Sequence, residues 1–261
     1  MVVHDGLTFT DVRFRYSPVE GLPVADVLHG ASFTLARGEV GAIIGASDAG
    51  KSTLIRVLAG LVPRFTGGAL AGTARFGDRD LMASLPWDAM ETMGLAFQNP
   101  DEQLVTTRCD SEVAFALESL GIPRAEMEAR IHRGLNLMGL DGMRQRNPGT
   151  LSGGEKKRLL LACLVAQGPQ LWLLDEAFQE LDAEWREAVL RQIRSEGRTA
   201  LFLDSRWSPL YRTHCSAAGV LANGRVRALA ELETAEELLE AEGLSLAGGS
   251  PAPGAADFRG A

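Results

Sequence analysis

The sequence predicts an α/β protein whose central sheet is parallel and covered by helices on both faces. The pattern of a buried strand, a short and mostly apolar run, recurs at 39–44, 93–97, 171–174 and 199–203. Segments of helical character, such as 51–61 and 183–195, lie between these runs. Strands that alternate with helices favour a parallel sheet, because the helix of each crossover packs on a face of the sheet.

Two segments near the start, 7–16 and 31–36, alternate apolar and polar residues as half-buried antiparallel strands do. They predict an N-terminal antiparallel β subdomain. The segment 220–228 has Asn223-Gly224 at its centre, a dipeptide that favours the tight turn of a β-hairpin.

The middle of the chain has a different character. The segments 112–120 and 124–138 have helical periodicity, and Gly and Pro residues bound them. We therefore expect a helical subdomain at about 100–150, inserted between two strands. One domain then spans 1–247, and the tail at 248–261, rich in Gly, Pro and Ala, is expected to be disordered.

Composition excludes several classes of protein. With 261 residues, 46% of them hydrophobic and 23% charged, the chain is typical of globular proteins whose core needs no disulfide. The formal charge is −8 and there is no basic stripe. We expect no nucleic-acid partner, because binding to a phosphate backbone needs clustered Lys and Arg.

Several features favour the cytoplasm. Cys109, Cys163 and Cys215 are odd in number and far apart, as is typical of reduced cysteines. Residues 1–9 lack the basic and apolar pattern of a signal peptide. The most apolar stretch, 159–174, is interrupted by polar residues, whereas a membrane span needs ~20 mostly apolar ones. We expect a chain that does not cross a membrane by itself.

The strongest motif is a loop between a predicted strand and a predicted helix. It consists of Gly45, Ala46, Ser47, Asp48, Ala49, Gly50, Lys51, Ser52 and Thr53, and it fits the phosphate-binding pattern G-x-x-x-x-G-K-[ST]. The glycines let the backbone wrap around an anion, which the loop amides and the helix N-terminus stabilise. Lys51 can reach the β and γ phosphates, and the Ser52 hydroxyl suits Mg²⁺. A Gly-rich turn could match by chance, but the predicted strand and helix around it favour the functional interpretation.

The apolar run at 171–174 ends in two acids, Asp175 and Glu176. They would lie at the carboxyl edge of the sheet, where open α/β sheets bind ligands. Asp175 would hold Mg²⁺ through water, and Glu176 would orient and polarise the attacking water. Many strands end in solvated acids, so the phosphate loop upstream is what favours this interpretation.

The run Leu151-Ser152-Gly153-Gly154-Glu155 precedes that strand and predicts a second anion site. Ser152 is a good N-cap, and Gly153 and Gly154 leave the first amides of the next helix uncovered. An ordinary helix start would need Ser152 alone. Paired glycines destabilise a helix start, so they favour close approach by a ligand.

In this order and spacing, the three motifs resemble those of ABC transporter ATP-binding subunits, over residues 7–245. The resemblance implies a P-loop NTPase (RecA-like) parallel sheet core with an N-terminal antiparallel β subdomain and an inserted helical subdomain. It also implies that two identical or homologous subunits sandwich two MgATP molecules. The phosphate loop of one subunit and Ser152, Gly153 and Gly154 of the other then hold each nucleotide.

The resemblance assigns further residues. Gln98 matches the family's lid glutamine, and with Ser52 and Asp175 it forms the implied Mg²⁺ site. Asp182 matches the dimer-contact loop. Tyr16 lies where the family stacks an aromatic ring on adenine, although a single tyrosine could equally pack on the surface.

Three segments, 98–104, 110–123 and 151–158, resemble a narrower branch, the energy-coupling-factor and cobalt-type importers. Its members drive uptake of vitamins and transition-metal ions through separate membrane subunits. Their helical subdomain and lid glutamine face the coupling helices of those subunits. The resemblance therefore implies a peripheral protein on the cytoplasmic face of the membrane. The transported compound stays open, because the motor does not touch it.

The chain departs from the family after the strand predicted at 199–203. Ser205 stands where the family has a His that contacts the γ phosphate, and it completes the predicted catalytic set with Glu176 and Gln98. Ser205 is short and would reach the phosphate poorly. Losing one aligned polar contact in such a site costs about 2.7–4 kcal/mol. The contact loop also departs, with Ala177-Phe178-Gln179-Glu180 in place of a Pro-Thr-Ser-Gly type run.

Two interpretations of the departure stay open. The chain could be the degenerate half of a heterodimer with unequal sites, in which hydrolysis runs mainly on the partner's motifs. Alternatively, Glu176 and Mg²⁺ sustain activity in a homodimer. A largely non-hydrolysing regulatory subunit is a further alternative, although Lys51, Ser52 and Asp175 are all present.

Other functional classes fit the sequence less well. A small-molecule kinase would share the phosphate loop but has no use for the run at 151–155. Soluble ABC ATPases of DNA repair or translation carry the same motifs, but usually with tandem motor domains, zinc modules or long insertions.

Overall fold

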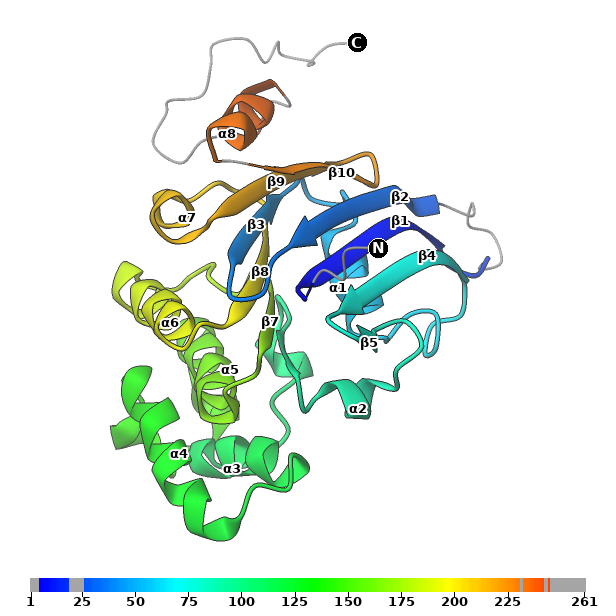
Figure 1. Ribbon diagram of the computed structural model, residues 1–261. Helices are drawn as coiled ribbons and strands as arrows, with labels where there is room; N and C mark the ends of the chain where they lie inside the picture. The colour runs from blue at the N-terminus through cyan, green and yellow to red at the C-terminus, as the bar shows by residue number, and fades with distance from the viewer. Residues whose placement is uncertain (1–4, 19–25, 231, 242–243, 245–261) are drawn as a thin grey trace, which may run out of the picture.

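The computed structural model describes residues 5–18, 26–230, 232–241 and 244. The tail predicted to be disordered, 248–261, lies outside these residues. Two sheets form the body of the molecule, and a group of helices extends from one end of it (Figure 1). The predicted fold class, an α/β protein with a parallel core and an antiparallel β portion, is confirmed.

The central sheet has the strand order β10-β9-β3-β8-β7-β6. Its members are β3 (Val40–Ile44), β6 (Met93–Ala96), β7 (Leu171–Asp175), β8 (Thr199–Asp204), β9 (Ala217–Ala222) and β10 (Arg225–Ala230). All of the neighbouring pairs are parallel except the hairpin β9–β10, whose turn is the predicted Asn223-Gly224. Every residue of β3, β7 and β8 is buried, because helices or the second sheet cover both faces.

The second sheet is antiparallel and has the order β2-β1-β4-β5. Its strands are β1 (Leu7–Arg15), β2 (Asp26–Leu35), β4 (Ala69–Phe76) and β5 (Arg79–Asp80). The predicted strand at 31–36 is only the second half of β2. The sequence did not predict β4, because its first half is rich in Ala and Gly and lacks the β-branched residues typical of strands.

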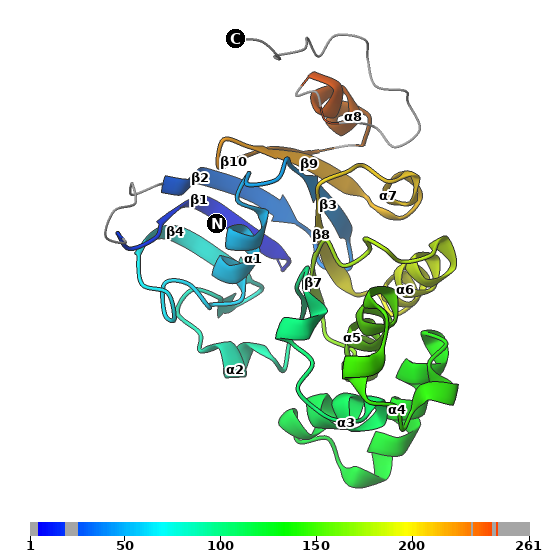
Figure 2. The same ribbon diagram turned by 180° about the vertical axis from the view of Figure 1, so that it is seen from behind.

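Helices cover the two faces of the central sheet unequally (Figures 1 and 2). The core on one face combines the antiparallel sheet and α1 (Lys51–Leu58) with Leu171 and Leu173 of β7. The core on the other face combines α5 (Gly153–Gln167) and α6 (Ala183–Ser195) with Trp172 and Leu174. Alternate residues of one strand thus serve two cores, as the two-residue period of a strand requires.

The segment between β6 and β7 holds α3 (Cys109–Ser119) and α4 (Arg124–Leu137), which pack against α5. The remaining short elements are α2 (Pro86–Ala89), α7 (Pro209–His214), α8 (Leu232–Ala241), and the 3₁₀ turns η1 (Pro100–Glu102), η2 (Asp141–Met143) and η3 (Pro148–Thr150). α1 ends three residues before the predicted boundary at 61, and Gly60, at φ +67°, follows it. Within the described residues, no helix combines the length and apolar character that a membrane span requires.

Candidate nucleotide-binding site

The carboxyl ends of four neighbouring strands bring the predicted site residues to one edge of the central sheet. β3 leads into the phosphate loop, and β8, beside it, ends at Asp204. β7 comes next and ends at Asp175, and β6 ends two residues before Gln98. The sequence therefore places phosphate-binding and acidic groups side by side, although they are far apart along the chain.

Two glycines shape the phosphate loop where side chains would not fit. A Cβ on Gly45 would lie 2.7 Å from the Leu221 carbonyl oxygen, so this position admits only glycine without a shift. Gly50 has φ +102°, which favours glycine, and α1 begins at the next residue, Lys51. The loop thus delivers the N-terminus of α1, with its unpaired amides, to the edge of the sheet.

The Lys51 ammonium is held by the loop itself. It donates hydrogen bonds of 2.9 Å to the carbonyl oxygens of Gly45 and Ala46. Its Nζ lies 3.3 Å from Oε1 of Glu176, and both side chains are buried. A phosphate that enters the loop would compete with Glu176 for this ammonium.

Glu176 is held on both carboxylate oxygens. Oε1 faces Lys51, and Oε2 accepts hydrogen bonds from the amides of Gln98 (2.8 Å) and Gln179 (2.7 Å). Its backbone has φ +49°, a left-handed conformation that costs a residue with a side chain about 1–3 kcal/mol. The strand β7 therefore ends abruptly, and the carboxylate is fixed at the edge of the sheet.

Asp175 is a buried carboxylate with one oxygen available to a metal ion. It is 2% exposed, and its Oδ1 has no hydrogen-bond partner among the described residues. Burial raises the pKa of the Asp175 carboxyl, an effect that a hydrogen bond from Ser52 and the charge of Lys51 oppose and that of Glu176 reinforces. The carboxylate, the Ser52 hydroxyl and the Gln98 amide oxygen form the kind of oxygen donor set that Mg²⁺ prefers. The residues present fit this ion.

Lys51, Ser52, Gln98 and Glu176 border a polar cavity of about 630 Å³, a size typical of ligand sites, and the buried Asp175 does not line it. The residues that line it are Tyr16, Val27, Ser47, Asp48, Gly50, Lys51, Ser52, Thr53, Arg56, Gln98 and Glu176. Tyr16 is half-buried, with its hydroxyl 3.1 Å from Oγ1 of Thr53 and its ring edge-on to Phe14. The cavity therefore combines a phosphate-binding end with an aromatic side chain.

The other predicted residues lie outside this cavity in the described part of the chain. Ser205 follows β8 and lines a neighbouring cavity with Gln179. Asp182 is exposed at the start of α6. Ser152 caps α5, which begins with Gly153 and Gly154, and none of the three lines this cavity.

Comparison of the sequence with known protein families agrees with this geometry. A family model described as ABC transporter matches residues 28–179, a range that includes the phosphate loop, Gln98, Ser152 and Asp175-Glu176. The chain belongs to the ABC transporter family.

Two relatives of this ABC family chain are energy-coupling factor transporter ATP-binding proteins. The one from Enterococcus faecalis is 38% identical over 188 residues, which are 72% of this chain and 64% of the relative. The one from Lactiplantibacillus plantarum is 38% identical over 215 residues, or 82% of this chain and 73% of the relative. The chain thus spans about two thirds of the length of these relatives. The predicted resemblance to the energy-coupling-factor branch is confirmed.

Two solved structures share the ABC fold. A subunit of the cbiONQ ABC transporter complex from Clostridium perfringens has a TM-score of 0.70 at 23% identity, covering 92% of this chain and 95% of that one. A dimeric ATP-binding cassette bound to ADP and phosphate has a TM-score of 0.75 at 19% identity, covering 87% and 98%. At these identities the likeness shows the fold alone.

The run at 151–155 of this ABC family chain caps the start of α5. The Ser152 hydroxyl accepts a hydrogen bond from the amide of Glu155, and the Glu155 carboxylate accepts one from the amide of Ser152. Ser152 and Gly153 are exposed, so the start of α5 is open to a ligand. The Ser152 hydroxyl can still donate its own hydrogen, because it acts here as an acceptor.

Sequence reasoning missed three residues near the ABC site. Val27 and Arg56 line the cavity, and no motif marks them. Gln179 lies in the departing run at 177–180, but its hydrogen bond to Glu176 depends on the turn that follows β7, which the sequence alone does not specify.

Asp48 places a carboxylate in the phosphate loop. It is exposed, lines the cavity and has φ +66°. Its carboxylate has the same sign of charge as the phosphates that the loop would bind, and two like charges about 4 Å apart in water repel by about 1 kcal/mol. Asp48→Gly is therefore expected to bind MgATP about two- to fivefold more tightly, as measured by equilibrium titration with a fluorescent ATP analogue. Asp48→Asn, which removes only the charge, should show most of the gain. Unchanged or weaker binding by both variants would contradict a repulsive role.

Proposed function

We propose that the chain is the ATP-binding subunit of an energy-coupling-factor-type importer. It binds and hydrolyses MgATP together with a second ABC subunit and drives the uptake of a vitamin or a metal ion through membrane subunits. The observation that carries this proposal is that the phosphate loop, Lys51, Asp175 and Glu176 lie together at one edge of the sheet. Residues 1–247 would form the nucleotide-binding domain, with the helical subdomain at about 100–150.

The phosphates of ATP would lie over the loop at 45–53. The amides at the start of α1 and the Lys51 ammonium would bind the β and γ phosphates, and Tyr16 would contact adenine. Ser52, Gln98 and Asp175 would hold Mg²⁺, which neutralises charge on the phosphates as the bond to the γ phosphate breaks. Phosphate binding would draw Lys51 away from Glu176 and leave that carboxylate able to orient water.

Each nucleotide would be closed off by a second subunit. Ser152 and Gly153, which are exposed, and Gly154 of one subunit would contact the γ phosphate held by the other, and Asp182 would lie at the contact between the subunits. Hydrolysis removes the group that both subunits bind, so the dimer would open after it. The partner is identical or homologous. We favour a homologous one, because Ser205 and the run at 177–180 depart from the family, so that the two sites of the dimer would differ.

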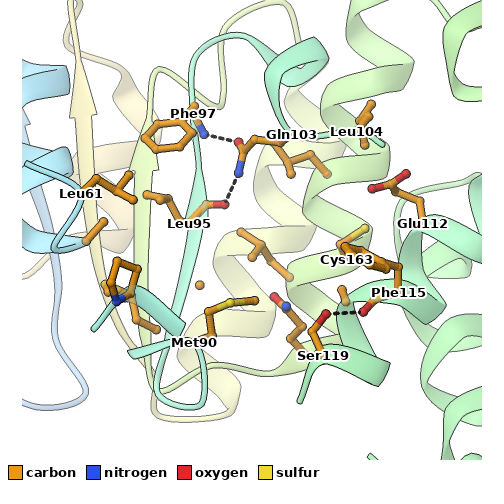
Figure 3. Close-up of a pocket in the computed structure, with 18 residues that line it drawn as sticks. Leu61, Met90, Leu95, Phe97, Gln103, Leu104, Glu112, Phe115, Ser119 and Cys163 are labelled. Carbon is orange, nitrogen blue, oxygen red and sulfur yellow. Dashed lines mark hydrogen bonds between the residues drawn. The ribbon is translucent and has the colours of Figure 1, made fainter. Parts of the chain in front are cut away.

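The membrane subunit would dock on a groove beside the site. The groove measures about 310 Å³ and is mostly apolar. Its lining includes Met90, Met93, Leu95, Phe97, Leu104 and Phe115 (Figure 3). The groove suits an apolar helix of a membrane partner because the side chains of Met90 and Phe115 remain exposed, by 40% and 50%.

Hydrogen bonds connect the wall of the groove to the strand that ends just before Gln98. The side chain of Gln103 accepts a hydrogen bond from the Phe97 amide (2.7 Å) and donates one to the Leu95 carbonyl (3.1 Å), as Figure 3 shows. It thus holds the groove wall at the end of β6, immediately before Gln98. A movement of Gln98 with the nucleotide would be transmitted to a helix in the groove, on the cytoplasmic face of the membrane.

Phe115→Glu tests this docking. The added charge would be buried against an apolar helix, so the variant is expected to retain less than a tenth of the wild-type co-purification with the membrane subunit. ATP hydrolysis by the chain with its second ABC subunit, measured without the membrane subunit, should be unchanged, because Phe115 does not line the nucleotide cavity. The measurement is recovery of the membrane subunit in detergent, followed by phosphate release.

A matched control is Ala129→Glu, which adds the same charge to an exposed position of α4 outside the groove. This variant should recover the membrane subunit fully. Equal recovery by Phe115→Glu and Ala129→Glu would remove the groove from the docking surface.

A further inference from the structure

The side-chain amide of Gln179 lies between Glu176 and Ser205. It donates to Oε2 of Glu176 (2.7 Å) and reaches Oγ of Ser205 (3.1 Å). The same nitrogen lies 3.4 Å from Oδ1 of Asp204. One amide therefore connects the end of β7 with the end of β8, at the place where water would be activated.

The neighbouring carboxylate keeps this connection rigid. Asp204 is buried and accepts the Tyr211 hydroxyl on Oδ2 (2.9 Å) and the Ser205 amide on Oδ1 (2.7 Å). Burial, together with the adjacent charge of Asp204, raises the pKa of Tyr211 well above its ordinary value. Tyr211 therefore stays a neutral donor. Its hydrogen bond fixes the Asp204 carboxylate, which lies beside the Gln179 amide.

The backbone of Gln179 is fixed from the opposite direction. The buried Lys157 of α5 donates a hydrogen bond of 3.0 Å to the Gln179 carbonyl oxygen. Lys157 lies one turn into the helix that begins at Ser152 and Gly153. Gln179 thus joins the start of α5, where a second subunit's nucleotide would bind, to Glu176, which acts on the chain's own nucleotide.

We propose that Gln179 is a positioning residue for hydrolysis: its amide holds the Glu176 carboxylate toward the attacking water and connects that carboxylate to the helix of the Ser152 motif. This role rests on the proposed function. It deepens that function, because it assigns to the departing run at 177–180 a part in the same site. It also lets the chain's own site turn over despite Ser205.

The test compares two single substitutions in the full-length chain, Gln179→Ala and Gln192→Ala. Each variant is assembled with the second ABC subunit that co-purifies with the wild-type chain. Gln192 is a matched control, since its amide bonds a different carboxylate, Glu196, at the far end of α6. We expect kcat to fall about 10- to 100-fold in Gln179→Ala, while the Kd for MgATP changes less than about threefold. Gln192→Ala should change neither quantity.

Gln179→Glu separates the hydrogen bond from the volume of the side chain. It keeps the length of Gln179, but an ionised carboxylate has no hydrogen to donate to Glu176. Its kcat should fall as in Gln179→Ala, while the Kd for MgATP should stay near that of the wild type.

The results distinguish failure of the positioning role from failure of the proposed function. Wild-type kcat in Gln179→Ala, or a loss of kcat that equals the loss of MgATP binding, would overturn the positioning role alone. A wild-type assembly that binds no MgATP and shows no turnover would overturn the proposed function and this role with it.

Discussion

Lys51→Ala is expected to weaken MgATP binding by about 100-fold or more. The variant loses an ammonium that would donate to charged phosphate oxygens, and each such hydrogen bond contributes about 1.5–3 kcal/mol. Titration with a fluorescent ATP analogue measures the Kd. The unfolding temperature must be followed in parallel, because Lys51 also bonds the buried Glu176 in the nucleotide-free protein.

Arg130→Ala is the control for this measurement. Arg130 pairs with Glu126 at 3.2 Å on α4 and does not line the nucleotide cavity, so its loss should leave the Kd within about twofold. If Lys51→Ala binds MgATP as tightly as Arg130→Ala does, the loop at 45–53 is not the phosphate site.

Glu176→Gln is expected to slow hydrolysis by about 10²–10⁴-fold and to leave MgATP bound. The amide has nearly the shape of the carboxylate, but it cannot take up a proton from the attacking water. It also carries no charge that would polarise this water. Phosphate release at saturating ATP gives kcat. The uncleaved nucleotide should also hold two subunits together, so the mass of the complex in MgATP should rise.

Glu187→Gln serves as the comparison, because Glu187 bonds His214 on α7 and lies outside the nucleotide cavity. Its kcat should match the wild type. A kcat for Glu176→Gln within about threefold of the wild-type value would show that another group activates the water.

Most of the parallel core could be predicted from the sequence, because each of its strands has a local signal. The runs that became β3, β7 and β8 are apolar on both faces, and motifs of fixed chemistry follow two of them. The antiparallel sheet was harder to predict. β4 pairs with β1 along most of its length, yet its outer half is Ala, Leu and Gly, and Gly72 has φ +99°. Pairing with β1, a tertiary effect, overrides the weak propensity of this segment.

The same distinction applies to the site. Lys51, Asp175 and Glu176 could be predicted because spacing along one strand or loop determines where they lie. The contact of Gln179 with Glu176 could not be predicted, since it requires the left-handed turn at Glu176, at φ +49°, and the anchor from Lys157 on another helix. The role of a residue that departs from a family motif, such as Gln179, can be inferred only when its contacts in the structure are known.

Hydrogen–deuterium exchange of the backbone amides, with and without MgATP in Glu176→Gln, tests the central claim most directly. If one triphosphate is bound by two sets of amides from different subunits, MgATP will slow exchange across 45–53, and across 152–156 only where a second subunit is present. Unchanged exchange across 45–53 at saturating MgATP would contradict the assignment of the phosphate site. Protection of 152–156 in the isolated monomer would contradict its contact with a neighbour's nucleotide.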